Sequence, residues 1–466
     1  MDRRKFLKNS SLLIGGTAVA STATTLAFPE KKAVYDKNDS FWAKELLTPN
    51  IPLTKNIDVD VAVIGGGYTG LSAAYHLKAY NPSLYVVVLE AMHLGYGASG
   101  RHGGMILTQP PTETFEIAHN IELHKTTYEL TSMNMIAIKN LIEECNLECD
   151  LKLDGYCHTI IDEEDAAYYI DYVAQVNKAG MPIEFWDAAK TEEKLGSGYY
   201  AASVFDPNGG SVHAVKFINA LKARAESVGV EIYENSEVKE ITEGKTIQLK
   251  VGAQSAIVNA KNIVLATNGY TSKLGYFKST TLPVHTQTAV TEPLTDEQVE
   301  KIGWESRLPF YDSKNHLMHL VLRDDNRIVI GGGDAQYYFR GDLHFHGDIN
   351  KVISLNETEL LKIYPALKGI KFENTWNGIL CMTSDDIPSI GVTGENGNIY
   401  YALGYCGQGV NMGFMYGNVI ASIMCGKVHG WEKTLYYNHK SGYIPPEPFR
   451  WIGAAVLMEY YKHLDK

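Results

Sequence analysis

Three glycines in the first quarter of the chain stand at the spacing G-x-G-x-x-G, and an acidic residue follows twenty positions after the last of them. Gly65 allows a tight turn, Gly67 lets the backbone approach a pyrophosphate, and Gly70 lets the following helix pack closely on the preceding strand. Free backbone amides at the start of that helix would face the phosphates. Glu90 stands where a carboxylate can accept hydrogen bonds from the ribose hydroxyls of an adenosine. These residue types at this spacing predict a dinucleotide site.

The elements that must position these residues can be recognised on both sides of the glycines. Residues 60–64 read as a strand that is apolar after Asp60, residues 68–77 have the pattern of a helix, and residues 84–89 form a second apolar strand. A bare G-x-G-x-x-G is a weak signal because glycine is common, but here strand, turn, helix, strand and acid occur in the order of a βαβ unit. Such a unit binds either NAD(P) or FAD, so the first motif alone leaves both open.

A second glycine-rich stretch covers residues 95–104, where five of the ten residues are glycine. This composition indicates backbone that closely approaches a ligand or another chain segment. His102 in this stretch, and His285 beside Gln287, are candidates for the face of a cofactor or substrate. Each could equally be a structural histidine satisfied by hydrogen bonds.

The last part of the chain returns to glycine-rich sequence at residues 385–391 and 404–409, before a predicted helix that runs to Cys425. The amides and the dipole at the start of this helix could stabilise negative charge. Small residues recur every four positions along it and leave one face smooth enough for close packing. These residues are Gly409, Gly413, Gly417 and Ala421.

The segments between these motifs show alternating helix and strand patterns. Helices are expected over residues 112–146, 163–180 and 213–228, with a hairpin turn at Asp154-Gly155. A buried strand at residues 261–266 runs into a small-residue turn at 267–269, which can pass beneath an adenosine. Strands at residues 316–323 and 327–333 indicate a second sheet that could cover the cofactor.

The composition limits which classes of protein and which partners are possible. The chain has 466 residues, of which 45% are hydrophobic and 21% charged, so two intertwined domains are expected. The formal net charge of −12 offers no basic field for DNA or RNA, and we exclude nucleic acid as a partner. The six cysteines include no C-x-x-C pair and no neighbouring histidine pair at ligand spacing, so no metal site is expected.

The N-terminus resembles a twin-arginine export signal. Arg3 and Arg4 begin the sequence R-R-x-F-L-K, and a run rich in glycine and alanine extends from Leu12 to Ala27. The twin-arginine export machinery transports folded, cofactor-loaded proteins. Because the run is short for a stable membrane span, we expect removal of residues 1–27 and a periplasmic protein. An uncleaved signal that anchors the protein to the membrane is the alternative.

Taken together, the motifs resemble those of the FAD-dependent D-amino-acid oxidase/glycine oxidase/sarcosine oxidase superfamily, most closely its γ-glutamylputrescine oxidase-like members. The resemblance covers about residues 35–466. The segments that carry it are Asp60–Leu71, Gly97–Gly104, Gly209-Gly210, Gln287–Pro293, Gly331–Gly333, Trp376–Gly378, Thr383–Asp385, Pro388 and Gly404–Gly409.

The resemblance implies an α/β fold in which a Rossmann-like FAD-binding domain is interleaved with an antiparallel-sheet substrate domain. The FAD-binding domain would comprise residues 58–110, 205–275 and 375–435, and the substrate domain residues 111–204 and 276–374. Residues 28–57 would be a lead-in and residues 436–466 a C-terminal segment. The residues implied to contact FAD are Gly65, Gly67, Tyr68, Thr69, Gly70, Glu90, Ala98, Ser99, Arg101, His102, Gly103, Gly104, Val238, Ala266, Thr267, Gly269, Gly378, Pro388, Gly404, Gly407, Gln408, Gly409 and Val410.

The activity implied by the resemblance is oxidation of the C–N bond of an amine or amino acid to an imine, by hydride transfer to flavin N5. The flavin would be reoxidised by O2, with formation of H2O2, or by a respiratory acceptor. One alternative is an NAD(P)-linked dehydrogenase, although the glycine-rich segments at 385–391 and 404–409 favour FAD. A second alternative is an exported protein that binds flavin without catalysis.

Two departures from the family pattern affect the site. His102 stands where close relatives commonly have asparagine. This histidine could either form a covalent bond to the flavin or make a non-covalent polar contact with it. Gly378 occupies the position of a flavin-linked cysteine in the monomeric sarcosine oxidase pattern, and Cys381 is displaced from it. The second departure is that Val321-Leu322 replace the aromatic pair that commonly precedes the substrate-domain arginine.

Arg323 matches that arginine and is the third catalytic candidate, beside His102 and His285. Strand period two places Leu317, His319, Val321 and Arg323 on one face, so Arg323 could form a bidentate pair with a substrate carboxylate. The alternative is a solvated residue at a hairpin end that balances Asp324 and Asp325.

Overall fold

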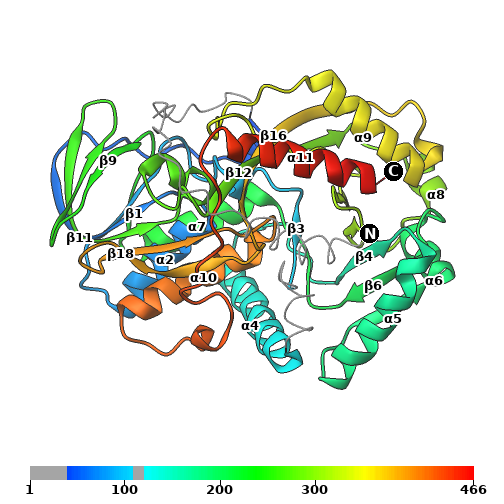
Figure 1. Ribbon diagram of the computed structural model, residues 1–466, viewed down its shortest axis with the longest axis horizontal. Helices are drawn as coiled ribbons and strands as arrows, with labels where there is room; N and C mark the ends of the chain where they lie inside the picture. Colours follow the sequence, from blue (N-terminus) through cyan, green and yellow to red (C-terminus); the bar gives the residue numbers. More distant parts are fainter. Residues whose placement is uncertain (1–38, 109–119, 466) are drawn as a thin grey trace, which may run out of the picture.

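The computed structural model describes residues 39–108 and 120–465, so the predicted signal peptide lies outside the described residues. The described residues form two eight-stranded sheets and one two-stranded sheet. Figure 1 shows the first large sheet, with β1, β11 and β18, on one side of the molecule, and β4 and β6 of the second sheet on the other. The predicted α/β fold with two interleaved sheets is therefore confirmed.

The first sheet is built on the predicted βαβ unit. β1 (Ile57–Ile64), α2 (Tyr68–Tyr80) and β2 (Val86–Leu89) follow one another, and β1 pairs in parallel with both β2 and β11. All four residues of β2 and the last four residues of β1 are apolar and buried, as expected for a parallel sheet that is covered on both faces. The strand order is β17-β18-β11-β1-β2-β8, with β10 paired to β11 and β9 to β10. The other strands are β8 (Glu231–Tyr233), β9 (Val238–Thr242), β10 (Ile247–Val251), β11 (Ala256–Leu265), β17 (Ser389–Thr393) and β18 (Ile399–Leu403).

The second sheet has the order β16-β12-β15-β14-β13-β4-β6-β5 and is antiparallel except between β13 and β4. Its strands are β4 (Tyr156–Ile160), β5 (Glu184–Asp187), β6 (Ala202–Asp206), β12 (Thr281–Thr291), β13 (Phe310–Asp312), β14 (Met318–Leu322), β15 (Ile328–Gly332) and β16 (Phe372–Thr383). β16 pairs with β12 along its whole length, so the domain boundary placed at residue 375 falls inside a strand. The small third sheet joins β3 (Met105–Ile106) to β7 (Gly210–Ser211).

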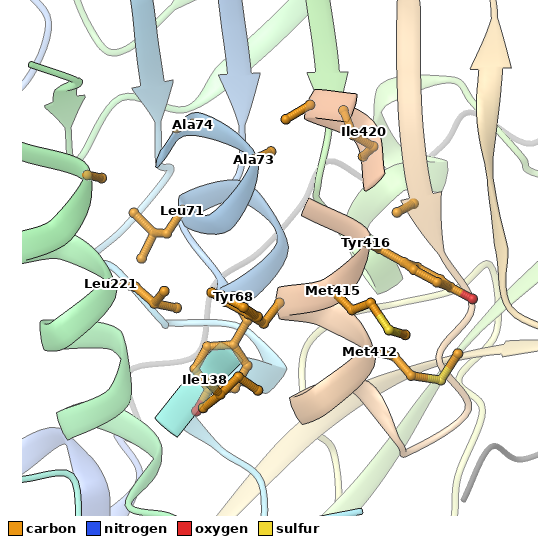
Figure 2. Packing of buried hydrophobic residues seen from close by; sticks show 14 of the residues in the cluster. Tyr68, Leu71, Ala73, Ala74, Ile138, Leu221, Met412, Met415, Tyr416 and Ile420 are labelled. Carbon is orange, nitrogen blue, oxygen red and sulfur yellow. The ribbon is translucent and has the colours of Figure 1, made fainter. Parts of the chain in front are cut away.

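Helix α2 lies in the largest apolar cluster, where it packs against α7 (Ala214–Ser227) and α10 (Gly409–Met424). Figure 2 shows side chains of α2 facing α10 on one side and α7 on the other. α4 (Ile121–Cys145) also packs against α7 and α10, through residues such as Ile138, so it joins the core of the first sheet rather than the second domain. The remaining helices are α5 (Glu163–Lys178), α6 (Ala188–Leu195), α8 (Asp296–Ile302), α9 (Ile349–Ile363), α11 (Phe449–Leu464) and the short η1 (Phe41–Glu45), η2 (Ala98–Gly100), η3 (Asn268–Leu274), η4 (Pro365–Leu367) and η5 (Trp431–Lys433).

The hairpin predicted at Asp154-Gly155 is wrong. Gly155 has a φ of +101°, as a turn would require, but its N–H donates to the Gly209 carbonyl at 2.9 Å. The following strand β4 pairs with β6 and β13, which are distant in the sequence. Local turn chemistry therefore identified a bend, whereas long-range pairing decided the partners of the strand.

Candidate functional site

A cavity of about 930 Å³ is lined by residues from both large sheets. Its volume is at the upper end of the range of about 300–1,000 Å³ that is usual for ligand sites. Residues at the carboxyl ends of β1, β2 and β11 line one part of it, which is where ligands bind in open parallel sheets. Strands β12 to β16 and helix α11 contribute another part.

The glycine turn after β1 has the shape of a phosphate cradle. Gly65 has a φ of +107°, and a Cβ there would lie 2.7 Å from the Ala266 carbonyl oxygen. A Cβ on Gly67 would lie 2.8 Å from Ser99 Oγ. Gly67 is the N-cap of α2 and offers no side chain to cap it. The Tyr68 N–H donates to Ser99 Oγ at 3.1 Å, and the amides that follow it in the first turn are left for an anionic ligand.

Glu90 lies at the end of β2 and lines the same cavity. Its carboxylate accepts hydrogen bonds from the Gly66 N–H at 2.7 Å and the Met92 N–H at 2.9 Å. Burial raises the pKa of Glu90, and the two backbone hydrogen bonds oppose that rise. Each carboxylate oxygen can accept a further hydrogen bond, so Glu90 can hold the glycine turn and still receive ribose hydroxyls.

The glycine-rich stretch 95–104 is held in place from two directions. Trp42 of η1 donates its indole N–H to the His102 carbonyl at 2.8 Å, and Trp376 of β16 donates to the Arg101 carbonyl at 2.8 Å. Arg101 donates to the carbonyls of Tyr96 at 2.6 Å and Asn377 at 3.1 Å. Arg101 therefore fastens this stretch to the second sheet.

His102 lines the cavity, and its hydrogen bonds determine its tautomer. The Gly104 N–H donates to His102 Nδ1 at 3.0 Å, so Nδ1 carries no proton. The Tyr68 hydroxyl donates to the Ala214 carbonyl at 2.9 Å, so it must accept from His102 Nε2, which is 2.9 Å away. Burial lowers the pKa of His102 to about 3, so the ring is neutral at pH 7. Both ring nitrogens are thus used by the protein itself.

The start of α10 lines the cavity beside the start of α2, where the Thr69 and Tyr405 hydroxyls are hydrogen-bonded at 2.6 Å. Gly407, Gln408, Gly409 and Val410 all line it, and no side chain caps the helix. The side-chain oxygen of Gln408 is buried and has no hydrogen-bond partner among the described residues. An uncapped helix end and an unsatisfied polar atom fit a polar ligand here, and the positive end of the dipole would favour negative charge on it.

Most residues predicted to contact the cofactor line this one cavity. They are Gly65, Gly67, Tyr68, Thr69, Glu90, Ala98, Ser99, Arg101, His102, Gly103, Val238, Ala266, Thr267, Gly269, Gly378, Gly407, Gln408, Gly409 and Val410.

Four predicted contacts do not line the cavity, and each lies behind it. Gly70 packs under the glycine turn, where a Cβ would lie 1.9 Å from the Gly65 carbonyl oxygen. Gly104 faces Trp42, and Pro388 is buried before β17. Gly404 donates its N–H to Asn268 Oδ1 at 3.1 Å. These residues shape the segments that line the cavity rather than the cavity surface.

His285 does not lie at the cavity, where the sequence-based candidate role would require it. Its side chain is fully buried and does not line the cavity. Nε2 donates to the Asp342 carbonyl at 2.9 Å, which leaves Nδ1 to accept from Asn377 Nδ2 at 3.3 Å. Period two along β12 instead brings Val284, Thr286 and Thr288 to the cavity.

Arg323 is also not placed for the predicted substrate clamp. It follows β14 and lies outside the cavity, where its guanidinium is 4.8 Å from the centre of a Trp42 ring. It pairs with Asp150 at 3.6 Å and with Asp325 at 3.3 Å. Leu317 and His319, two residues of the predicted strand face, do line the cavity. The cavity ends before Arg323, which lies further along the same strand.

The structure adds cavity residues that the sequence reasoning did not assign to the site. They are chiefly Thr286, Thr288, Tyr311, His316, His319, Met458 and Tyr461. His319 approaches the glycine-rich stretch so closely that a Cβ on Gly103 would lie 2.0 Å from its Nε2. Met458 and Tyr461 come from α11, and their spacing of three is that of one helix face. No local signal connects that helix to the cavity.

The described ranges hold no group of three or more histidine, cysteine, aspartate or glutamate side chains that could bind a metal ion. Cys381 and Cys406 line the cavity, and all six cysteines are free thiols. Burial raises the pKa of Cys381 to about 12, so this thiol is protonated at neutral pH and is a poor nucleophile.

Comparison with known proteins agrees with this site. A family model described as FAD dependent oxidoreductase matches residues 60–423. The chain is 28% identical over 433 residues to gamma-glutamylputrescine oxidoreductase from Escherichia coli, which covers 89% of this chain and 94% of that protein.

Two solved structures share the fold. Glycine oxidase from Geobacillus kaustophilus matches with a TM-score of 0.66 at 19% identity, over 80% of this chain and 95% of that one. L-proline dehydrogenase from P. horikoshii matches with a TM-score of 0.68 at 23% identity, over 82% of this chain and 98% of that one. The family match spans well over half of the chain and agrees with the glycine turns and Glu90 around one cavity. The chain therefore belongs to the family of FAD-dependent oxidoreductases.

Proposed function

We propose that this enzyme oxidises the C–N bond of an amine or amino acid to an imine and passes the electrons to O2 or another acceptor. The observation that carries the proposal is one cavity that joins the dinucleotide-binding glycine turns to a wall of the second sheet. Relatives named for gamma-glutamylputrescine, glycine and L-proline support a nitrogen-bearing substrate. The flavin, when bound, supplies the hydride acceptor at N5.

In this proposal the side chains of the protein bind and orient the cofactor and the substrate, and they do not exchange protons with the substrate. The first turn of α2 and Glu90 would hold the adenosine diphosphate part, and the start of α10 would stabilise negative charge on the reduced ring system. Burial lowers the pKa of His319 to about 4, so the ring beside the glycine-rich stretch is neutral at pH 7. A neutral amine needs no protein base for hydride loss, which agrees with a wall that has no charged acid–base pair.

The test is to mix the purified yellow protein anaerobically with a panel of amines and amino acids and to follow the visible flavin absorbance. Bleaching by at least one compound is expected. Protein that bleaches only with NAD(P)H would favour the NAD(P)-linked alternative, and protein that no compound bleaches would favour the non-catalytic one. Admitting O2 to the reduced protein then separates an oxidase, which forms H2O2, from a dehydrogenase that needs another acceptor.

Export to the periplasm is a further part of the proposal, and the N-terminal sequence Arg3-Arg4-Lys5-Phe6-Leu7-Lys8 supports it. Those residues lie outside the described ones. Among the residues that the structure does describe, no helix is long and apolar enough to cross a membrane.

Replacing Arg3 and Arg4 together with lysine should block export, because the positive charge stays while the arginine pair is lost. Fractionation should find the FAD-loaded precursor in the cytoplasm. Lys5→Arg, which leaves the pair intact, is the matched control and should be exported. An unaltered chain that stays uncleaved and wholly cytoplasmic would refute the proposal.

FAD should be held without a covalent bond. Both His102 nitrogens are engaged in hydrogen bonds, Gly378 has no side chain, and the Cys381 thiol is protonated. Acid precipitation of the purified protein should therefore leave the flavin in the supernatant and the polypeptide at its unmodified mass. A yellow pellet, with a polypeptide heavier by the mass of FAD, would show that one of these side chains is linked after all.

Arg323→Met should change kcat/KM for flavin reduction by less than about threefold, because a charge outside the cavity cannot clamp the substrate. It should lower the free energy of unfolding by about 1 kcal/mol through loss of the contact with Trp42 and the pair with Asp150. Arg327→Met, which removes a neighbouring cation of similar exposure, is the control. A fall in kcat/KM of more than about thirtyfold in Arg323→Met alone, with FAD retained, would show that Arg323 does bind a substrate carboxylate.

A further inference from the structure

The wall that the second sheet and α11 present to the cavity has no formal charge. Its lining is partly apolar, through residues such as Val284, Ile379 and Met458, and it also carries hydroxyl, phenol and imidazole side chains. We call the six residues that carry these hydroxyl, phenol and imidazole groups the sheet wall. They are Thr286, Thr288, Tyr311, His316, His319 and Tyr461. No lysine, arginine, aspartate or glutamate of the described residues lines the cavity from β12, β13, β14, β15, β16 or α11.

The two histidines of the sheet wall do not supply a cation at neutral pH. Burial lowers the pKa of His319 to about 4. Burial also lowers the pKa of His316, although the nearby Asp465 carboxylate opposes that shift. Asp465 itself accepts from the His316 backbone N–H at 2.8 Å, so its charge is engaged by the backbone behind the wall.

The described cations that line the cavity all belong to other elements. Lys239 and Lys250 stand on β9 and β10, and Figure 1 shows β9 at the outer edge of the first sheet, away from β12 and β16. Arg101 is bonded to the Tyr96 and Asn377 carbonyls. Lys273, in η3, donates to the Arg340 carbonyl at 3.1 Å.

A carboxylate on the reacting carbon would have to enter this wall together with the amine. Moving a carboxylate from water to a wall without a positive partner costs much free energy. Alkyl carbons can instead pack on the ring faces of the wall, and a neutral amine can form hydrogen bonds with its hydroxyls. The family-type arginine cannot supply the partner, because Arg323 lies outside the cavity and is paired with Asp150 and Asp325. A substrate carboxylate held against the sheet wall would therefore meet no counter-charge from the second sheet or α11.

We propose that the substrate is an amine whose reacting carbon carries no carboxylate. This inference rests on the proposed amine or amino-acid oxidation and narrows its substrate class. The amine binds as the neutral base, and the rest of its chain lies along the sheet wall. Amino acids with the same chain bind poorly because their α-carboxylate meets no counter-charge.

The test compares matched series on the unaltered holoenzyme, by anaerobic flavin reduction. Each series contains an amine, the amino acid that would give it on decarboxylation, and the primary amide of that amino acid. Suitable series start from butylamine with norvaline and norvalinamide, and from N-acetylputrescine with Nδ-acetylornithine and its amide, using both enantiomers. The amide has nearly the size of the carboxylate but no charge, so it separates electrostatic exclusion from crowding.

In every series that reduces the flavin, the amine should exceed the amino acid in kcat/KM by at least ~100-fold, and the amide should recover most of that loss. An amino acid equal to or better than its amine would overturn the inference while leaving the proposed function in place. An amide as poor as the acid would also overturn it, because crowding rather than charge would then be the cause. If no member of any series and no compound of the amine and amino-acid panel bleaches the flavin while the protein retains FAD, the proposed function itself fails.

Lys273→Met gives an independent measurement. Lys273 is one of the described cations that line the cavity, and its ammonium contacts the loop at Arg340 and Gly341 that follows β15 of the second sheet. The ratio between amine and amino acid should stay within about threefold of the wild-type ratio. A selective loss of amino-acid turnover in this variant would identify Lys273 as a carboxylate partner and overturn the inference. FAD content, read from the visible spectrum, shows that the comparison is made on loaded enzyme.

Discussion

Replacing Gly67 with valine should leave a folded but colourless protein. Gly67 caps α2, and a Cβ there would already lie 2.8 Å from Ser99 Oγ, whose hydroxyl accepts from the Tyr68 N–H at 3.1 Å. The larger side chain would occupy the route by which a pyrophosphate reaches the amides of the first turn. Loss of two charge-assisted hydrogen bonds, at about 1.5–3 kcal/mol each, corresponds to at least ~100-fold weaker FAD binding.

The measurement is the ratio of visible flavin absorbance to protein absorbance after purification, followed by FAD titration of the apoprotein. Gly453→Ala is the matched control, because Gly453 lies within α11 and a Cβ there meets no atom within 4 Å. The control should keep FAD and gain about 0.5–1 kcal/mol of helix stability. Near-normal FAD affinity in Gly67→Val would mean that the cofactor does not pass over this turn.

Replacing Gly417 with alanine should cause the largest loss of stability of any single methyl group added to α10. A Cβ on Gly417 would lie 2.5 Å from Ser72 Cβ and 2.6 Å from both the Ala73 nitrogen and the Thr69 carbonyl oxygen. Two of these three atoms belong to the α2 backbone, so the helices must separate rather than rotate a side chain. We expect a loss of about 2–3 kcal/mol in the free energy of unfolding, the usual range for overpacking.

Separation of the helices would also disturb the cavity. Ser72 Oγ donates to the Phe414 carbonyl at 2.5 Å, and the hydroxyls of Thr69 and Tyr405 are hydrogen-bonded at 2.6 Å, so α2 and the segment before α10 are tied together beside the cofactor. Weaker FAD binding should therefore accompany the loss of stability. Denaturant unfolding of the apoprotein measures the first effect, and FAD titration measures the second.

Gly413→Ala, one turn earlier on the same face, is the control for this prediction. Its Cβ would lie 3.3 Å from Thr69 Oγ1 and 3.4 Å from Tyr68 Cβ, distances that small side-chain shifts can relieve. Its effect on unfolding should stay within about 1 kcal/mol, because helix propensity favours alanine over glycine. Equal losses in the two variants would show that added bulk on this face, rather than close approach of α2 at Gly417, limits stability.

The sequence by itself determined those features whose signal lies within one supersecondary unit. The glycine spacing from Gly65 to Gly70 predicted a strand, a turn and a helix, because each glycine meets a steric demand made by atoms a few residues away. The four-residue repeat through Gly413 and Gly417 predicted close packing along α10 for the same reason, although not its partner. The family resemblance added the cofactor, and the family match confirms it.

Only the tertiary structure decided which side chains meet at the substrate end of the cavity. Period two correctly placed Leu317, His319 and Arg323 on one strand face, but it contains no information on how far along the strand the cavity extends. His285 was a reasonable candidate by residue type, yet the opposite face of β12 lines the cavity. In both cases the deciding contacts come from residues far away in the sequence.

The C-terminal helix shows the same limit most clearly. Met458 and Tyr461 reach the cavity because Asp465 accepts hydrogen bonds from the Asn315 and His316 N–H groups, and Lys462 pairs with Asp334 at 2.6 Å. These contacts join segments more than a hundred residues apart, and nothing in the local pattern of residues 449–464 indicates them. The sequence therefore determined the cofactor and its cradle, whereas the chemistry of the substrate wall depends on long-range packing, since that wall is assembled from side chains that only the folded chain brings together.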